Sequence, residues 1–323
     1  MTSVGRRLRP LRSRPVGAAA PTGRRGAPAS RREAQDAAAR ADALLGATDW
    51  SRRLPGAEYG FLPAPSGRLA GVLVPAPDYV VSPDRVLLLP GLTGSKEDFV
   101  LVAPLLAAAG YLVESFDLAG QHESAAAGPP PGERYTYELY VSDVVTLLER
   151  DGPAHLVGYS FAGIVAQLVA VARPDLVRSL TLLATPPGYG NGFHDVSYLG
   201  WASRLAGPRV VASLMLWGVR NNLNGVDAAR ASFVRRRLAS TRRESVDDAI
   251  DLMMHIPDLR ADVARLPVPR LVVVGRHDLW TVRRHARFAA SIGARFGCYG
   301  RGHSPNETAP HQLVVDLVRL FAA

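Results

Sequence analysis

Short apolar runs alternate with segments of helical length over most of this 323-residue chain. The runs are too short for helices and show no polar alternation, which is typical of strands buried on both faces. Strands that alternate with helices of about 10–15 residues predict an α/β protein, with a mostly parallel sheet covered on both faces. The predicted strands are Val86–Leu89, Tyr111–Phe116, His155–Tyr159, Val177–Leu183, Arg270–Val274 and Arg295–Tyr299, after a hairpin of Glu58–Leu62 and Leu69–Val74. The predicted helices cover residues 96–109, 138–150, 161–172, 282–292 and 312–321.

The alternation is lost in the middle of the chain. We therefore predict a body formed by residues 54–185 and 267–323, with a helical cap inserted at residues 186–266. An insertion that follows the carboxyl end of a strand lies over the edge where ligands bind in open α/β sheets. The large side chains of this insertion, which pack it onto the body or line a pocket, include Trp201, Met215, Trp217, Met253 and Met254.

The net charge of +9 is concentrated at the N-terminus. Residues 1–53 contain twelve arginines and four acidic residues, so only one net charge remains for the rest of the chain. Their Arg-, Ala-, Pro- and Gly-rich composition predicts a disordered tail, with a short helix near residues 37–45 as its one ordered piece. Because the body is almost neutral, we expect no nucleic-acid partner, although the tail could bind an anionic surface.

Several classes of protein are excluded by what the sequence lacks. No run of 18 apolar residues occurs, so we expect no transmembrane segment, and no apolar stretch suits a secretory signal, so we expect a cytoplasmic protein. The single cysteine, Cys298, excludes a disulfide framework. The histidines show no metal-ligand spacing and no nucleotide-binding loop is present, so we expect neither a metal nor a cofactor.

One strand ends in a serine between small residues and turns at once into a helix. The sequence Gly158-Tyr159-Ser160-Phe161-Ala162-Gly163 has the form of a nucleophile elbow, which lifts the Ser160 hydroxyl clear of the backbone. Small residues are needed on both sides because the two backbones pass closely there. An ordinary strand–turn–helix could contain such a serine by chance, so the interpretation depends on partners elsewhere.

A serine hydroxyl needs a base within hydrogen-bond reach and an acid that orients the base. The best base is His303, in the loop after the last strand, and the best acid is Asp278, directly after the strand that ends at Val274. All three follow carboxyl ends of predicted parallel strands, in the chain order Ser, Asp, His of this architecture. Asp195 is the alternative acid. His277 is interpreted as a neighbour of the acid and His122 as stabilising a turn.

The same chemistry needs two amides that stabilise an oxyanion. The first should come from Phe161, which follows the serine. The second should come from the turn Pro90-Gly91-Leu92-Thr93-Gly94, with the N–H of Leu92 as the favoured donor.

These motifs, in this order, resemble the α/β-hydrolase superfamily over about residues 57–323, and specifically its serine hydrolases that carry a cap. Three positions depart from the usual pattern: Ala162 replaces a glycine, Pro90 replaces a histidine that braces the oxyanion turn, and the acid after His303 is shifted by one position to Glu307. The shift suggests a differently shaped loop, and none of the three changes removes a triad residue.

The resemblance implies acyl transfer to water, since relatives that open epoxides or remove halides use a carboxylate at the elbow. We expect a serine hydrolase that cleaves an ester, thioester or lactone of a largely apolar small molecule. Three alternatives remain: an enzyme that processes acyl groups on an acidic carrier protein, a hydrolase of activated C–C bonds, and a ligand-binding member without activity.

Overall fold

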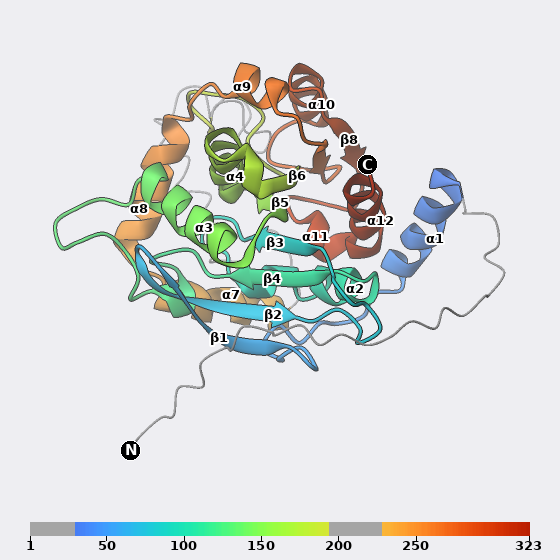
Figure 1. Cartoon of the computed structure of the whole chain (residues 1–323), viewed down its shortest axis with the longest axis horizontal. Helices are drawn as coiled ribbons and strands as arrows, with labels where there is room; N and C mark the ends of the chain where they lie inside the picture. Colours follow the sequence, from blue (N-terminus) through green and yellow to red (C-terminus); the bar gives the residue numbers. More distant parts are fainter. Residues whose placement is uncertain (1–29, 194–227) are drawn as a thin grey trace.

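The computed structural model describes residues 30–193 and 228–323, and a sheet of eight strands forms its centre (Figure 1). The spatial order is β1-β2-β4-β3-β5-β6-β7-β8. The pairs β1·β2 and β2·β4 are antiparallel and the other five are parallel, which confirms the predicted α/β class. The strands are β1 (Glu58–Ala64), β2 (Gly67–Val74), β3 (Arg85–Leu89), β4 (Leu112–Phe116), β5 (Ala154–Tyr159), β6 (Val177–Leu183), β7 (Arg270–Val274) and β8 (Arg295–Cys298).

Helices cover both faces of this sheet. Leu87 and Leu89 of β3 pack in one apolar cluster, while Val86 and Leu88 pack in a second cluster on the opposite face. Burial on both faces explains why the strands read as continuous apolar runs. The first cluster includes residues of α3 (Tyr137–Asp151), α4 (Phe161–Ala172) and α10 (Val282–Ser291), and the second includes residues of α2 (Val102–Ala108) and α12 (Pro310–Phe321).

The described part of the predicted cap is helical. It contains α7 (Ala228–Ser240), α8 (Arg243–Met254) and α9 (Arg260–Arg265). Helix α8 docks on the body because the Tyr137 hydroxyl donates to the carbonyl of Leu252 at 2.9 Å, while Met253 is buried in the core. Trp201, Met215 and Trp217 lie outside the described residues, so the bounds 186–266 of the cap stay a prediction.

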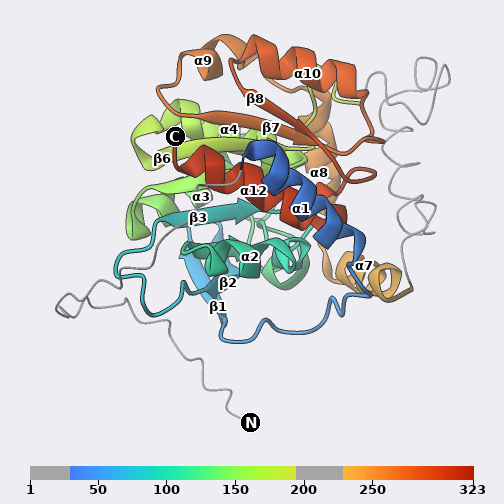
Figure 2. The same ribbon diagram turned by 90° about the vertical axis from the view of Figure 1, so that its right-hand side faces the viewer.

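The N-terminal segment corrects the prediction of a disordered tail over residues 1–53. Residues 31–43 form helix α1 (Arg31–Ala43), which lies against α12 (Figure 2). The carboxylate of Asp42 accepts hydrogen bonds from the backbone N–H groups of His311 and Gln312 at 2.9 and 3.1 Å, and so caps the first turn of α12. The short helix predicted near residues 37–45 thus begins earlier, and composition does not show its full length because polar contacts to a distant element, rather than a wide apolar face, attach it. The prediction for residues 1–29 lies outside the described residues.

Replacement of Asp42 by alanine is expected to lower the free energy of unfolding by about 1 kcal/mol, the usual cost of a lost helix cap. Urea denaturation monitored by circular dichroism measures this change. The matched control is Asp36→Ala, which removes an exposed carboxylate from the same helix. Equal destabilisation by the two substitutions would show that the Asp42 contacts do not hold α1 on α12.

In the part of the chain that the structure describes, no helix has both the length and the apolarity needed to cross a membrane.

Candidate active site

Ser160 occupies a strained turn between β5 and α4. Its φ of 51° and ψ of −119° lie outside the backbone regions that residues other than glycine usually adopt, as the predicted elbow requires. A Cβ at Gly158 would lie 2.5 Å from the carbonyl oxygen of Ala162, and one at Gly163 would lie 1.8 Å from the Thr185 hydroxyl. Gly158 therefore permits the close approach of β5 and α4, Gly163 permits the close approach of α4 to Thr185 after β6, and Ala162 is accommodated in place of the usual glycine.

The three residues predicted as a triad lie together. His303 Nε2 is 2.9 Å from the Ser160 hydroxyl oxygen, and His303 Nδ1 is 3.0 Å from Asp278 Oδ1. They come from the loops after β5, β7 and β8, which open at the carboxyl edge of the sheet. Asp278 is buried, whereas His303 keeps 22% of its side chain exposed, so the base can be reached from outside.

The acid is held by the loop that carries it. The backbone N–H of Trp280 lies 3.4 Å from Asp278 Oδ1, and its indole N–H donates to the carbonyl of Gly192 at 2.8 Å. The indole ring also packs against the imidazole of His303, with the ring centroids 5.8 Å apart. Asp195, the alternative acid, lies outside the described residues, and His277 is an exposed neighbour of Asp278 in the sequence.

The turn after β3 approaches the serine from the other side. A Cβ at Gly91 would meet the Ser160 Cβ at 3.1 Å, so the two backbones are almost in contact. The turn is closed by the N–H of Gly94, which donates to the carbonyl of Gly91 at 2.9 Å, and Thr93 has a φ of 57°. Leu92 follows Gly91 and Phe161 follows Ser160 in the chain, and the role of their N–H groups as oxyanion donors stays a prediction.

A buried charge cluster that sequence reasoning missed holds this turn. Asp98, in the 3-10 turn η1 (Lys96–Phe99), accepts from Arg237 at 2.5 Å and from Arg230 at 3.0 Å, both on α7. Arg230 also pairs with Glu307 of α11 (Pro305–Thr308), in the loop that carries His303. Helix α7 is thus tied to η1, which follows the turn after β3, and to the loop that carries His303. The acid that the sequence places at position 307 is therefore one partner of this ion pair.

Burial raises the pKa of Asp98, but the guanidinium groups of Arg237 and Arg230 lower this pKa by more than burial raises it. The net shift is therefore downward, and the carboxylate stays ionised. Burial also raises the pKa of Glu307, which the charge of Arg230 offsets only in part. The Arg230 guanidinium lies over the buried ring of Trp50, 4.1 Å from its centroid. Trp50, which follows α1 in the chain, therefore packs against this buried charge cluster.

Arg230→Met is expected to lower the free energy of unfolding by about 3–5 kcal/mol, since it removes the ion-pair partner of Glu307 and leaves buried Asp98 with Arg237 alone. The control is Arg235→Met, which changes an exposed arginine of the same helix and should be nearly neutral. Chemical denaturation of both variants measures the difference. A loss below about 1 kcal/mol, the range of exposed pairs, would contradict a structural role for the cluster.

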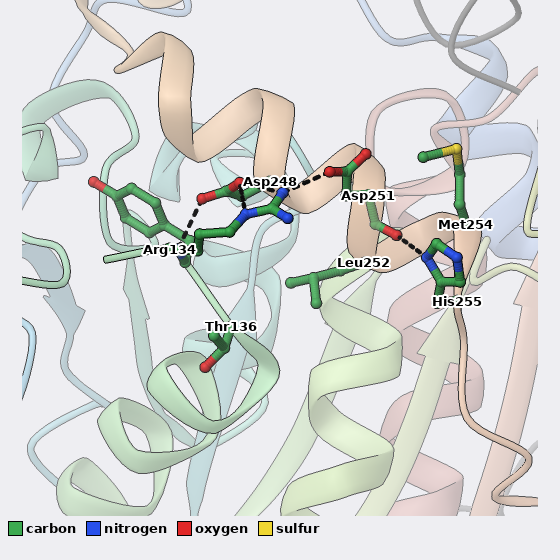
Figure 3. A pocket seen from close by; sticks show the side chains of 8 residues that line it. Arg134, Thr136, Asp248, Asp251, Leu252, Met254 and His255 are labelled. Atoms are coloured by element: carbon green, nitrogen blue, oxygen red, sulfur yellow. Dashed lines mark hydrogen bonds and ion pairs between the residues drawn. The ribbon is translucent and has the colours of Figure 1, made fainter. Parts of the chain in front are cut away.

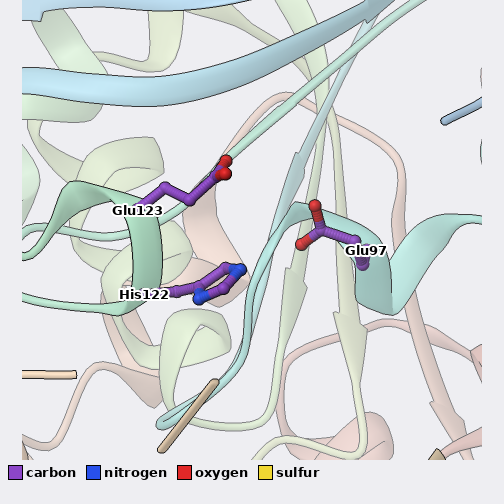
Figure 4. Close-up of side chains that lie close together, drawn as sticks. All are labelled: Glu97, His122 and Glu123. Atoms are coloured by element: carbon purple, nitrogen blue, oxygen red, sulfur yellow. The ribbon is translucent and has the colours of Figure 1, made fainter. Parts of the chain in front are cut away.

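Three side chains in the described residues have the types and spacing of a metal site. Glu97, His122 and Glu123 bring ligand atoms within 4.8 Å of one another (Figure 4). However, the ammonium of Lys96 lies 3.2 Å from Glu97 and 2.5 Å from Glu123, so both carboxylates already have a cation of the protein as an ion-pair partner. His122 contacts the Ser240 hydroxyl at 2.9 Å and thus joins its turn to the end of α7, in agreement with its predicted role.

A cavity of about 410 Å³ lies away from the serine, between α8 and the segment before α3 (Figure 3). Arg134 points into it and donates to Asp248 at 2.7 Å and to Asp251 at 2.5 Å. This ion pair joins α8 to the body, and neither Ser160 nor His303 lines the cavity.

The fold is that of an α/β hydrolase, and comparison with known proteins agrees. A family model described as "Alpha/beta hydrolase family" matches residues 86–317, well over half of the chain. The chain therefore belongs to the α/β hydrolase family. Among solved structures, a hydrolase from Pseudomonas aeruginosa PA01 is similar with a TM-score of 0.64 and 24% identity, over 82% of this chain and 99% of that one.

Among the curated relatives, one matches a short segment of this chain and another matches most of it. The pig (Sus scrofa) protein "Bifunctional epoxide hydrolase 2" is 36% identical over 85 residues, which is 26% of this chain and 15% of that protein. "Polyketide synthase ThaQ" of Burkholderia thailandensis is 27% identical over 284 residues, which is 82% of this chain and 13% of that protein. This chain thus spans only a small part of both relatives.

Proposed function

We propose that the protein is a serine hydrolase that works through an acyl-enzyme on Ser160. The observation that carries the proposal is the position of His303, whose two ring nitrogens lie 2.9 Å from the Ser160 hydroxyl and 3.0 Å from Asp278. A base between nucleophile and acid, on the edge of the sheet where the oxyanion turn also lies, is the arrangement that activates a serine.

The reaction would proceed in two halves. His303 Nε2 takes the proton of Ser160 while the serine oxygen attacks the carbonyl carbon, and the N–H groups of Leu92 and Phe161 stabilise the oxyanion. His303 then protonates the leaving alcohol or thiol as its bond to carbon breaks. In the second half, His303 removes a proton from water, which attacks the ester on Ser160. The acid is released and the proton returns to the serine.

The serine also favours a class of substrate. A hydroxyl nucleophile suits esters, thioesters and lactones, whereas the members of the superfamily that open epoxides use a carboxylate at the elbow. An apolar acyl or ring portion fits the Trp- and Met-rich sequence of the insertion. We propose a small, largely apolar carboxylic ester or thioester as the substrate, hydrolysed in the cytoplasm.

A second candidate is an enzyme that hydrolyses a thioester on an acidic carrier protein. The alignment with ThaQ over 82% of this chain favours it, as does the excess of arginine in residues 1–53, which would attract an acidic partner. Removal of residues 1–29, which leaves α1 intact, should then slow the hydrolysis of a carrier-bound thioester but not of the same free thioester. An equal effect on the two would reject the carrier.

The proposed function is tested by a panel of p-nitrophenyl esters and acyl thioesters of increasing chain length, with His303→Gln as the blank. We expect hydrolysis of at least one series, with a preferred chain length. Turnover that is unchanged in His303→Gln would reject the triad.

A further inference from the structure

Beside the triad acid lies a group of buried polar atoms that have no hydrogen-bond partner among the described residues. Asp278 Oδ1 faces His303 and the Trp280 N–H, but Oδ2 is buried and has no hydrogen-bond partner among the described residues. His285 Nε2, on α10, lies 3.8 Å from that oxygen. Both ring nitrogens of His285 are likewise buried without a partner in the described part of the chain, and its side chain is 0% exposed. Adjacent groups of this kind call for an explanation, since buried polar atoms are nearly always paired.

The surroundings of His285 would suit an apolar residue. Its ring meets that of Trp280 edge to face, 6.1 Å between centroids, and Phe288 and Ala289 of the same helix are core residues. A leucine or phenylalanine would fill this space without the cost of burying two unpaired nitrogens. The histidine therefore has a use that packing alone does not supply.

The imidazole of His285 is neutral near pH 7 and can act as a hydrogen-bond donor. Burial lowers its pKa to about 4, and the charges that act on it come from Asp278 and His303 on the facing loops and from Arg284 on its own helix. A neutral imidazole carries one N–H, which can be placed on Nε2. Such a donor would hold the carboxylate of Asp278 in place. Because it carries no charge, it would not repel the protonated form of His303.

We propose that His285 is a positioning residue of the triad, whose Nε2–H holds Asp278 Oδ2 so that Oδ1 stays directed at His303. This inference rests on the proposed function. The pair must close by about 1 Å to form a normal hydrogen bond, as hydrogen bonds in ligand-free sites do when the reaction complex forms. Without this donor the carboxylate can rotate, and the base loses its orientation.

Two variants separate positioning from packing. His285→Phe fills the space but cannot donate, whereas His285→Gln keeps an N–H near the position of Nε2. The control is His155→Phe, a change to another buried histidine that is hydrogen-bonded to Ser179 and is not part of the proposed catalytic site. The readouts are the rate of Ser160 labelling by a fluorophosphonate, kcat and KM for a p-nitrophenyl ester, and the melting temperature.

We expect His285→Phe to slow labelling and lower kcat roughly 10- to 100-fold, the effect of a misplacement near 1 Å, with KM changed little. His285→Gln should restore most of this loss, and His155→Phe should lower only the melting temperature. If His285→Phe labels at the wild-type rate, or if His285→Gln is as slow as His285→Phe, the positioning role is wrong. If wild-type protein is not labelled, the proposed function fails, and the inference with it.

The pH dependence of stability provides an independent check. The unfolded chain binds a proton on His285 below about pH 6.5, whereas the folded protein resists protonation down to about pH 4. Stability should therefore fall as the pH falls through this window, and it should fall less steeply in His285→Gln. Equal slopes would contradict a buried neutral histidine at this position.

Discussion

Replacement of Ser160 by alanine is expected to lower kcat for an activated ester on the order of 10⁶-fold, as loss of the nucleophile does in serine hydrolases. The fold should survive, because the hydrogen bond of the hydroxyl joins it to His303 and not to a structural element of the core. The measurement is steady-state hydrolysis, with the melting temperature as a check of folding.

The control for this loss is Ser304→Ala. Ser304 follows His303 in the chain and its hydroxyl is 2.9 Å from that of Tyr159, so the variant perturbs the same region without touching the nucleophile. We expect it to keep most of the activity. If Ser160→Ala retains activity comparable to Ser304→Ala, an acyl-enzyme on Ser160 is excluded.

Asp278→Asn is expected to lower kcat about 10³- to 10⁴-fold. The amide keeps the size of the side chain but cannot stabilise protonated His303, and it favours the wrong tautomer of the imidazole. The matched control is Asp258→Asn, which changes an exposed carboxylate paired with Arg260 on the surface. A loss of less than about tenfold would show that another group is the acid, and Asp195→Asn would then be the next variant to measure.

The sheet and the triad could be predicted because their signals are local. The strands after residue 85 are buried on both faces and therefore appear as short apolar runs, and Ser160, Asp278 and His303 each follow such a run at its carboxyl end. Topology then places them together, and the structure has their side chains within hydrogen-bond distance. The elbow is local in the same sense, since Gly158 reflects the close contact of β5 with the start of α4.

The supports of the site could not be predicted in this way. Asp98, Arg230 and Glu307 are far apart in the sequence, and each resembles a surface charge until the fold buries them together. Asp42 caps α12 from a helix almost 270 positions away in the chain. Such polar contacts follow no period of 2.0 or 3.6 residues, so only the folded structure shows them.

The most direct test of the central claim is the mapping of a phosphonate adduct. Folded wild-type protein is treated with a fluorophosphonate, digested and analysed by mass spectrometry, with Ser160→Ala treated in parallel. We predict one stoichiometric adduct on Ser160, and none at that position in heat-denatured protein, because reactivity depends on His303 and Asp278. The account would be contradicted if the folded wild-type protein formed no adduct, or if Ser160→Ala formed as much adduct as the wild-type protein.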